Sequence, residues 1–174
     1  MNKLIQALSY AAIAHKDQRR LGVNRTPFIN HPIEVCRILS EVGGITDEDI
    51  LCAGILHDVQ EDCPITNEDL EMLFGYRVAN MVQECSDDKS LPKQERKRLQ
   101  IVHTKTISDD AKLIKLADKI ANMQSLLNDT PNWPLERKLQ SFEWSYEVVG
   151  WIKGLNPALE EMFADVYNQK EFLK

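Results

Sequence analysis

The sequence predicts an all-α fold. Apolar residues recur every three or four positions through the long segments, which is the spacing of one helix face. Most glycines and prolines fall between these segments, as helix breakers do. No segment alternates apolar and polar residues in the way that a half-buried strand requires. At 174 residues the chain has the usual length of one domain, so residues 1–174 are expected to form a single compact helical bundle.

In the N-terminal half, start and stop signals divide the chain into helices. Pro32 suits a first helical turn, where its missing N–H costs little. Thr46 and Asp49 form a Ser/Thr-x-x-Asp start signal. Pro64 and Gly75 separate the segments that follow. Helices are therefore expected over residues 2–19, from His31 to Gly43, and over 47–61, 66–73 and 76–86, with a loop over 21–30.

The C-terminal half shows the same kind of signals. Pro92 suits a first helical turn, and Ser108 can cap the helix that follows it. Two prolines make residues 130–134 a turn, and Gly154 with Pro157 separates the last two helices. Helices are expected over residues 92–106, 109–128, 135–153 and 157–171.

The charge of the chain is negative overall but unevenly distributed. A net charge of −6 argues against a general nucleic-acid-binding protein. Residues 15–25 nevertheless contain four basic residues against one acidic residue, and residues 92–106 contain five against one. Such segments are usually solvated helix faces. On an acidic protein the two segments could also bind one small polyanion between them.

Several features indicate a cytoplasmic protein. No apolar run approaches the eighteen or so residues of a membrane span. The N-terminal residues do not show the pattern of a signal peptide. The four cysteines lack CxxC spacing, which fits reduced thiols. The tryptophans Trp133, Trp144 and Trp151 could belong to the core or to an interface, and the core is the expected place. The sequence leaves the oligomeric state open.

The chemically most informative segment is residues 55–62, where polar side chains interrupt an apolar stretch. His57 and Asp58 lie inside the stretch, and Glu61 and Asp62 follow at once. Burying a charge costs several kcal/mol unless the charge is paired or bound to a metal. In a continuous helix Asp58, Glu61 and Asp62 share one face, and His57 reaches only its rim. These residues therefore suggest a divalent cation.

Two further residues complete a candidate metal site. Asp118 lies in an apolar setting with Asn122 one turn on, and His31 follows the loop. Alone, a buried histidine is usually a hydrogen-bonded core residue, and an aspartate beside lysines is usually an ion-pair partner. With His57 and Asp58 they form a mixed nitrogen and oxygen ligand set, which suits Mn²⁺, Fe²⁺ or Zn²⁺.

The order of His31, His57-Asp58 and Asp118 resembles the HD-domain metal-dependent phosphohydrolases. Longer motifs are similar to the hydrolase domain of RelA/SpoT proteins. The segment 86–100, SDDKSLPKQERKRLQ, is especially similar to the stand-alone hydrolases of animals and some bacteria. The resemblance covers residues 5–170 and includes no synthetase domain. The other shared motifs are Arg19-Arg20, Thr26-Pro27-Phe28-Ile29-Asn30-His31-Pro32, Leu56-His57-Asp58-Val59-Gln60-Glu61-Asp62, Asp87-Asp88-Lys89 and Lys115-Leu116-Ala117-Asp118-Lys119.

The resemblance implies an HD-domain helical bundle with a defined activity. The implied enzyme is Mn²⁺-dependent and removes the 3′-diphosphate from guanosine tetra- and pentaphosphate, giving GDP or GTP and pyrophosphate. Its partner is thus a small nucleotide, and Zn²⁺ or Fe²⁺ are alternatives for the single metal ion. Matched position by position, the implied metal ligands are His31, His57, Asp58 and Asp118, the catalytic acidic pair is Glu61 and Asp62, and the substrate contacts are Arg20, Lys93, Asn122 and Arg137.

Four positions depart from the usual family pattern. Gln60 replaces an apolar residue, and Ala121 stands where tyrosine or histidine is frequent. Leu21 stands where lysine can occur, and Ser141 where an aromatic residue is usual in the animal proteins. None of these departures removes a metal ligand, so they bear on substrate preference more than on hydrolysis.

Two alternatives remain open. The same pocket could remove the 2′-phosphate of NADPH or a phosphate of another nucleotide, although Leu21 weakens the NADPH reading because a lysine there could meet the extra phosphate. The second alternative is a degenerate HD domain that senses the guanosine nucleotide or binds a partner without catalysis. Degenerate HD domains usually lose ligands, and this chain retains all four together with the acidic pair.

Overall fold

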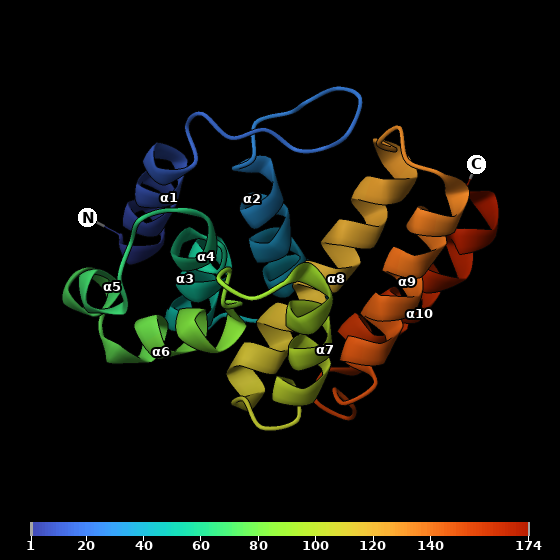
Figure 1. Ribbon diagram of the computed structural model, residues 1–174. Helices are drawn as coiled ribbons and strands as arrows, with labels where there is room; N and C mark the ends of the chain where they lie inside the picture. Colours follow the sequence, from blue (N-terminus) through green and yellow to red (C-terminus); the bar gives the residue numbers. More distant parts are fainter. Residues whose placement is uncertain (1, 174) are drawn as a thin grey trace.

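Helices form most of the protein in the computed structural model, which describes residues 2–173 (Figure 1). Within this range there is no strand, and an isolated bridge pairs Arg19 with Pro27. The all-α prediction is therefore confirmed. None of the helices described is long and apolar enough to cross a membrane. The α-helices are α1 (Lys3–Ala14), α2 (Asn30–Arg37), α3 (Glu48–Leu56), α4 (Val59–Asp62), α5 (Asn67–Phe74), α6 (Tyr76–Cys85), α7 (Lys93–His103), α8 (Asp109–Asn128), α9 (Leu135–Val149) and α10 (Pro157–Asn168), with a π-helix (Ile38–Val42) after α2 and a 3₁₀ helix (Gln169–Phe172) after α10.

The long helix α8 joins the two halves of the protein. It lies between α2, α3 and α6 on one side and α9 and α10 on the other, and it contacts each of these helices (Figure 1). Its residues Ile114, Leu116 and Ile120 are fully buried, as their helical spacing predicts. They belong to a core that also contains Phe142. Because Asp118 comes from the same helix, the core holds it in place.

The expectation of one continuous helix over residues 47–61 is wrong. A turn at His57 and Asp58 separates α3 from α4. In an uninterrupted helix the carbonyl of Gly54 accepts a hydrogen bond from the amide four residues on, which is that of Asp58. Here the Nδ1–H of His57 donates to the Gly54 carbonyl over 2.8 Å. The turn brings the side chains of His57 and Asp58 toward α2 and α8.

The first helix is also shorter than expected, because the chain bends toward α4. Helix α1 stops at Ala14 and does not continue to residue 19. The Nε2 of Gln18 donates to the carbonyl of Asp62 over 3.1 Å, and the Gln18 carbonyl accepts from the amide of Phe28, also over 3.1 Å. The first bond ties the loop between α1 and α2 to α4, and the second joins two parts of this loop. The other expected helices agree with the observed ones to within a few residues.

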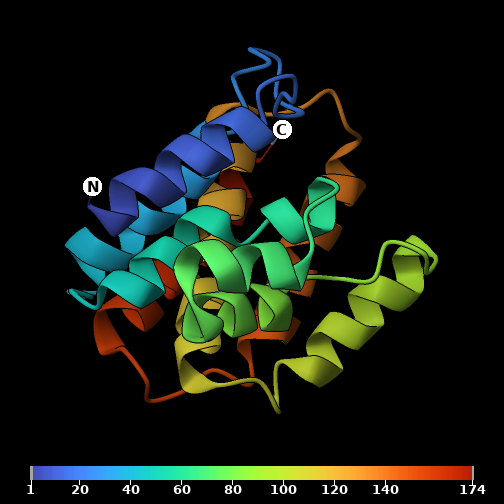
Figure 2. The same cartoon turned by 90° about the vertical axis from the view of Figure 1, so that its left-hand side faces the viewer.

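Two segments lie at the edges of the molecule near α8 and α9. The loop between α1 and α2 crosses the top of the view in Figure 1 and reaches the C-terminal end of α8. Helix α7 projects from the body in Figure 2, and it packs against α9. Both segments are basic in sequence, and their placement decides what their charges can contact.

Candidate metal centre and active site

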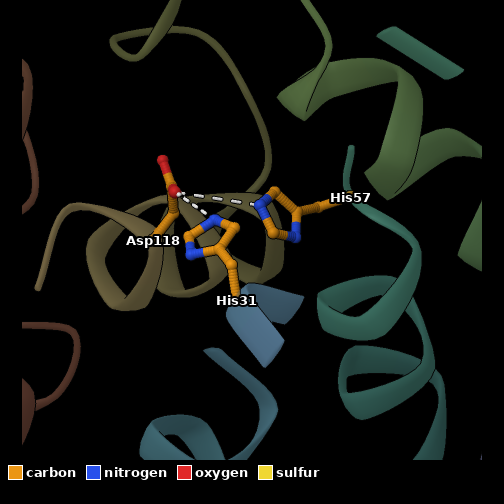
Figure 3. Close-up of side chains that lie close together, drawn as sticks. All are labelled: His31, His57 and Asp118. Atoms are coloured by element: carbon orange, nitrogen blue, oxygen red, sulfur yellow. Dashed lines mark ion pairs between the residues drawn. The ribbon is translucent and has the colours of Figure 1, made fainter. Parts of the chain in front are cut away.

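Three parts of the chain bring four of the predicted residues into one cluster. His31 comes from the start of α2, Asp118 from α8, and His57 and Asp58 from the turn after α3. The Nε2 of His31 lies 3.1 Å from Oδ1 of Asp118 and 3.6 Å from Oδ2 of Asp58. The Nε2 of His57 lies 3.3 Å from Oδ2 of Asp58 and 3.7 Å from Oδ1 of Asp118. Figure 3 shows both imidazoles turned toward the carboxylate of Asp118.

The donor atoms of this cluster fit a divalent cation. One ligand atom each of His31, His57 and Asp118 lies within 4.8 Å of the other two. The Nδ1–H of His57 donates to the Gly54 carbonyl. Its buried Nε2 makes no hydrogen bond among the described residues, and the carboxylates of Asp58 and Asp118 are its polar neighbours. A buried polar atom without a partner costs free energy and calls for an explanation. Metal-ligating histidines commonly donate their other N–H to a backbone carbonyl, so His57 has the surroundings of a metal ligand.

The charges of the cluster interact strongly. Burial lowers the pKa of His31, and its hydrogen bond to Asp118 offsets only part of that effect. Burial also opposes the charged form of His57, but Asp58 and Asp118 outweigh it and raise the pKa of His57 well above its ordinary value. Burial raises the pKa of both carboxyls, but neighbouring cations outweigh it and lower both values. The largest lowering effect comes from His57 for Asp58 and from Lys119 for Asp118. The directions of these shifts favour a neutral His31 and a protonated His57 beside two carboxylates in the metal-free protein.

Further hydrogen bonds orient Asp118 from outside the cluster. The Nζ of Lys119 lies 3.0 Å from Oδ2 of Asp118. The Nδ2 of Asn122 donates to Oδ1 of Asp118 over 2.5 Å, and the Nη2 of Arg20 donates to Oδ1 of Asn122 over 2.8 Å. This chain of contacts links two predicted substrate residues to a candidate metal ligand and fixes the direction of its carboxylate.

A cavity of about 570 Å³ opens beside the cluster. Sites for small molecules and cofactors commonly measure about 300–1,000 Å³, so a nucleotide fits this volume. Eight of the ten predicted site residues line the cavity. The two that lie outside the lining are His57 and Asp62. The eight lining residues are Arg20, His31, Asp58, Glu61, Lys93, Asp118, Asn122 and Arg137.

The two carboxylates of the predicted catalytic pair have different surroundings. The Oε2 of Glu61 accepts a hydrogen bond from the amide of Asp87 over 3.2 Å, and Oε1 lies 3.7 Å from the Nζ of Lys89. Burial raises the pKa of Glu61, and neighbouring carboxylates add to the effect. Asp62 instead forms an ion pair with Lys89. Glu61, which faces the cavity with a raised pKa, has the environment of a proton-transfer group.

One wall of the cavity combines cations with indole rings. The Nζ atoms of Lys97 and Lys119 lie 4.7 and 4.2 Å from the centre of the Trp144 ring. The guanidinium of Arg137 lies 3.8 Å from the centre of the Trp133 ring. The expectation that the tryptophans belong to the core is wrong, because these two line the cavity and the third is half exposed. The basic segment of α7 predicts positive charge, but only the fold shows which of its side chains face the cavity.

The family and the class of protein follow from comparison with known sequences. The family model described as HD domain matches residues 7–141. The chain belongs to the HD-domain family, as its motifs predict.

Individual relatives are similar to this chain over nearly its whole length. The Xenopus tropicalis protein named guanosine-3′,5′-bis(diphosphate) 3′-pyrophosphohydrolase MESH1 is 48% identical over 167 residues, covering 93% of each chain. The Homo sapiens protein of the same name is 44% identical over 169 residues, covering 97% of this chain and 94% of its own. A solved structure of a metazoan ortholog of SpoT, described as hydrolysing ppGpp with a role in starvation responses, has a TM-score of 0.94 at 46% identity and covers 99% of this chain and 98% of that chain. The predicted resemblance to stand-alone hydrolases is therefore confirmed.

Proposed function

We propose that this protein is a divalent-metal-dependent hydrolase that removes the 3′-diphosphate of guanosine tetra- and pentaphosphate, giving GDP or GTP and pyrophosphate. The observation that carries the proposal is the buried Nε2 of His57, which makes no hydrogen bond among the described residues and faces two carboxylates beside a cavity of nucleotide size. Relatives that bear the name of this activity cover almost the whole chain. All four cysteines lie within the described residues and are free thiols, which supports a place in the cytoplasm.

The proposed metal ligands are His31, His57, Asp58 and Asp118. Mn²⁺ is the first candidate, and Zn²⁺ and Fe²⁺ suit the same donor types. A divalent cation supplies Lewis-acid chemistry here, because it acidifies a water molecule and polarises a phosphoryl oxygen. The two carboxylates would balance its charge. The neutral His31 would bind through Nε2 with no net loss of a proton, once the proton that Nε2 shares with Asp118 has moved to Nδ1.

The reaction adds one water molecule to the 3′-diphosphate. The water oxygen bonds to the phosphorus next to the ribose, the bond from that phosphorus to the ribose 3′ oxygen breaks, and this oxygen takes up the proton that Glu61 removes from the water. Glu61 accepts the proton of the water, because burial raises its pKa and the amide of Asp87 holds its carboxylate at the cavity wall. Asp62 completes the acidic pair, and its ion pair keeps Lys89 beside Glu61.

The cations of the cavity bind the phosphate groups of the substrate. Arg20 and Arg137 line the cavity and can form bidentate contacts with phosphate, whereas Lys93 offers a point charge. Asn122 holds Arg20 on one side and Asp118 on the other. A phosphate bound by Arg20 is thereby placed near the metal cluster.

The test is pyrophosphate release from guanosine tetraphosphate by the purified protein, with and without Mn²⁺. Equal amounts of GDP and pyrophosphate, formed only with the metal, are expected. Glu61→Gln removes the proposed proton acceptor and should abolish most turnover. The matched control is Glu68→Gln, which makes the same charge change at an exposed position on α5 and should retain turnover. Release of inorganic phosphate, or no release at all, would argue against the proposal.

The cavity also fits removal of the 2′-phosphate of NADPH, because its cations recognise phosphate whatever the base. Leu21 lines the cavity and is 69% exposed, and it supplies no charge for the extra phosphate. Guanosine tetraphosphate is for this reason the first candidate. Phosphate release from NADPH, measured in parallel, separates the two activities. A domain that only binds would release nothing from either nucleotide.

A further inference from the structure

The loop between α1 and α2 is fastened to the C-terminal end of α8 by three residues, Gly22, Asn24 and Asp129, here termed the loop clasp. The Oδ1 of Asp129 accepts hydrogen bonds from the backbone amide of Asn24 over 3.1 Å and from its Nδ2 over 2.9 Å. Gly22 lies so close to the same carboxylate that a β-carbon on it would fall 1.9 Å from Oδ2. In Figure 1 the loop reaches across to this end of α8.

The glycine at position 22 is required by this close approach and not by its backbone conformation. Left-handed φ angles occur at Gly44, Gly75 and Gly154, and Gly22 does not share them. An alanine at position 22 would therefore be unstrained in φ. Its β-carbon would still lie 2.2 Å from Cγ and 2.6 Å from the carbonyl oxygen of Asp129. Because the carbonyl belongs to the backbone, the loop would have to move away from α8.

The same loop carries residues that face the cavity. Arg20, Leu21 and Gly22 line it, and Asp129 lines it from the C-terminal end of α8. The amide of Arg20 donates to the carbonyl of Thr26 over 2.9 Å, which closes the loop on itself. Its guanidinium donates to Asn122 on α8. The loop is thus attached to α8 at two points, one through Arg20 and one through the loop clasp.

We propose that Asp129 is a positioning residue, which holds Arg20 and Leu21 against the cavity through the loop clasp. The proposal rests on the proposed function, since the cavity must be the substrate site. A wall that is ordered before the ligand arrives lowers the entropy lost on binding. Breaking the loop clasp should therefore weaken substrate binding. It should leave the chemical step nearly unchanged, because the hydrogen bonds of the loop clasp join the loop to α8 and do not involve Glu61 or the metal cluster.

Substitutions on both sides of the contact test the proposal by steady-state kinetics with guanosine tetraphosphate and Mn²⁺. Asp129→Ala removes both acceptors and should raise KM about tenfold, or ~1.4 kcal/mol, with kcat changed by less than about twofold. Asp129→Asn keeps an oxygen acceptor at Oδ1, so its KM should stay within about threefold of the wild-type value. Gly22→Ala should resemble Asp129→Ala. In the double variant KM should rise by less than the combined effects of the two single changes, because both changes break the same contact.

Hydrogen exchange supplies a readout that does not depend on catalysis. In the metal-free protein, the amides of residues 21–26 should exchange faster in Asp129→Ala and Gly22→Ala, and at the wild-type rate in Asp129→Asn. Two control variants change the same residue types elsewhere. Asp165→Ala removes an exposed carboxylate of α10, and Gly150→Ala adds a β-carbon whose nearest neighbours are carbonyl oxygens at 3.3 and 3.5 Å. Both controls should match the wild type.

The outcomes separate this proposal from the proposed function. Faster loop exchange together with a raised KM supports the positioning role. Unchanged exchange in Asp129→Ala overturns the loop clasp, and faster exchange with an unchanged KM overturns its role in binding. If even the wild-type protein releases no pyrophosphate, the proposed function fails alone. The affinity for GDP, measured by calorimetry on the same variants, then takes the place of KM.

Discussion

Adding Mn²⁺ to the metal-free protein at neutral pH is expected to release about one proton, from His57. A metal ligand must offer a lone pair, so a protonated imidazole loses its proton on binding. Burial opposes the charged form of His57, but Asp58 and Asp118 outweigh it and raise its pKa well above the ordinary value. Burial lowers the pKa of His31, and both carboxyls are already ionised. The four groups therefore hold one releasable proton between them.

Isothermal titration calorimetry can count this proton. The observed binding heat varies linearly with the ionisation enthalpy of the buffer, and the slope is the number of protons released. His57→Ala should weaken binding and bring the slope to about zero. His103→Asn, which changes an exposed histidine of α7, should leave the slope at about one.

The sign of the pH dependence follows from competition between the proton and the metal for Nε2 of His57. Metal affinity should fall as the pH falls, by about tenfold or ~1.4 kcal/mol per unit below the raised pKa of His57. Above that pKa this residue should add no further pH dependence. If the binding heat at neutral pH did not vary with the ionisation enthalpy of the buffer, the reasoning would be refuted. His57 would then have to be neutral beside two carboxylates. An affinity that does not change with pH on the acid side of neutrality would refute the reasoning equally.

Three further predictions concern the acidic pair, a buried ion pair and a helix cap. Glu61→Gln should lower kcat by about 10²–10⁴-fold in steady-state assays. Asp62→Asn should lose most turnover in the same assays, and elemental analysis should show that it keeps the metal. Lys119→Met leaves the carboxylate of Asp118 without its lysine. In the presence of a chelator, the free energy of unfolding measured with urea should fall by about 3–5 kcal/mol. With Mn²⁺ the loss should be smaller, because the charge of the metal replaces that of the lysine. Thr66→Ala removes one side of the capping box of α5 and should cost ~1 kcal/mol in urea unfolding, with turnover unchanged.

The helical pattern predicts an element well when capping and packing agree with periodicity. Helix α8 has the bounds expected from the sequence, because the Ser108 hydroxyl accepts from the amide of Ala111 at the helix start and the apolar residues that follow reach the core. The turn at His57 shows where the pattern fails. Periodicity treats His57 as one more helical position, whereas its imidazole bonds to the carbonyl of Gly54.

The sequence proposes the members of the candidate site but not their arrangement. Residue type and order point to the metal cluster, because buried histidines and aspartates need a partner. The sequence does not predict that Asp62 forms an ion pair with Lys89 while Glu61 lines the cavity. Gly22 and Asp129 belong to no motif, and their contact exists only because the loop folds onto α8. Such contacts between distant parts of the chain carry no local signal.

The placement of Trp133 and Trp144 makes the cavity observable in the unlabelled protein. These are two of the three tryptophans in the chain, and both lie under cations that face the cavity. The emission of an indole depends on the charges near its ring. A phosphate that draws Lys97 or Arg137 off these rings should therefore change the intrinsic fluorescence as the ligand enters. Trp151 is half exposed and does not line the cavity, so it contributes a constant background.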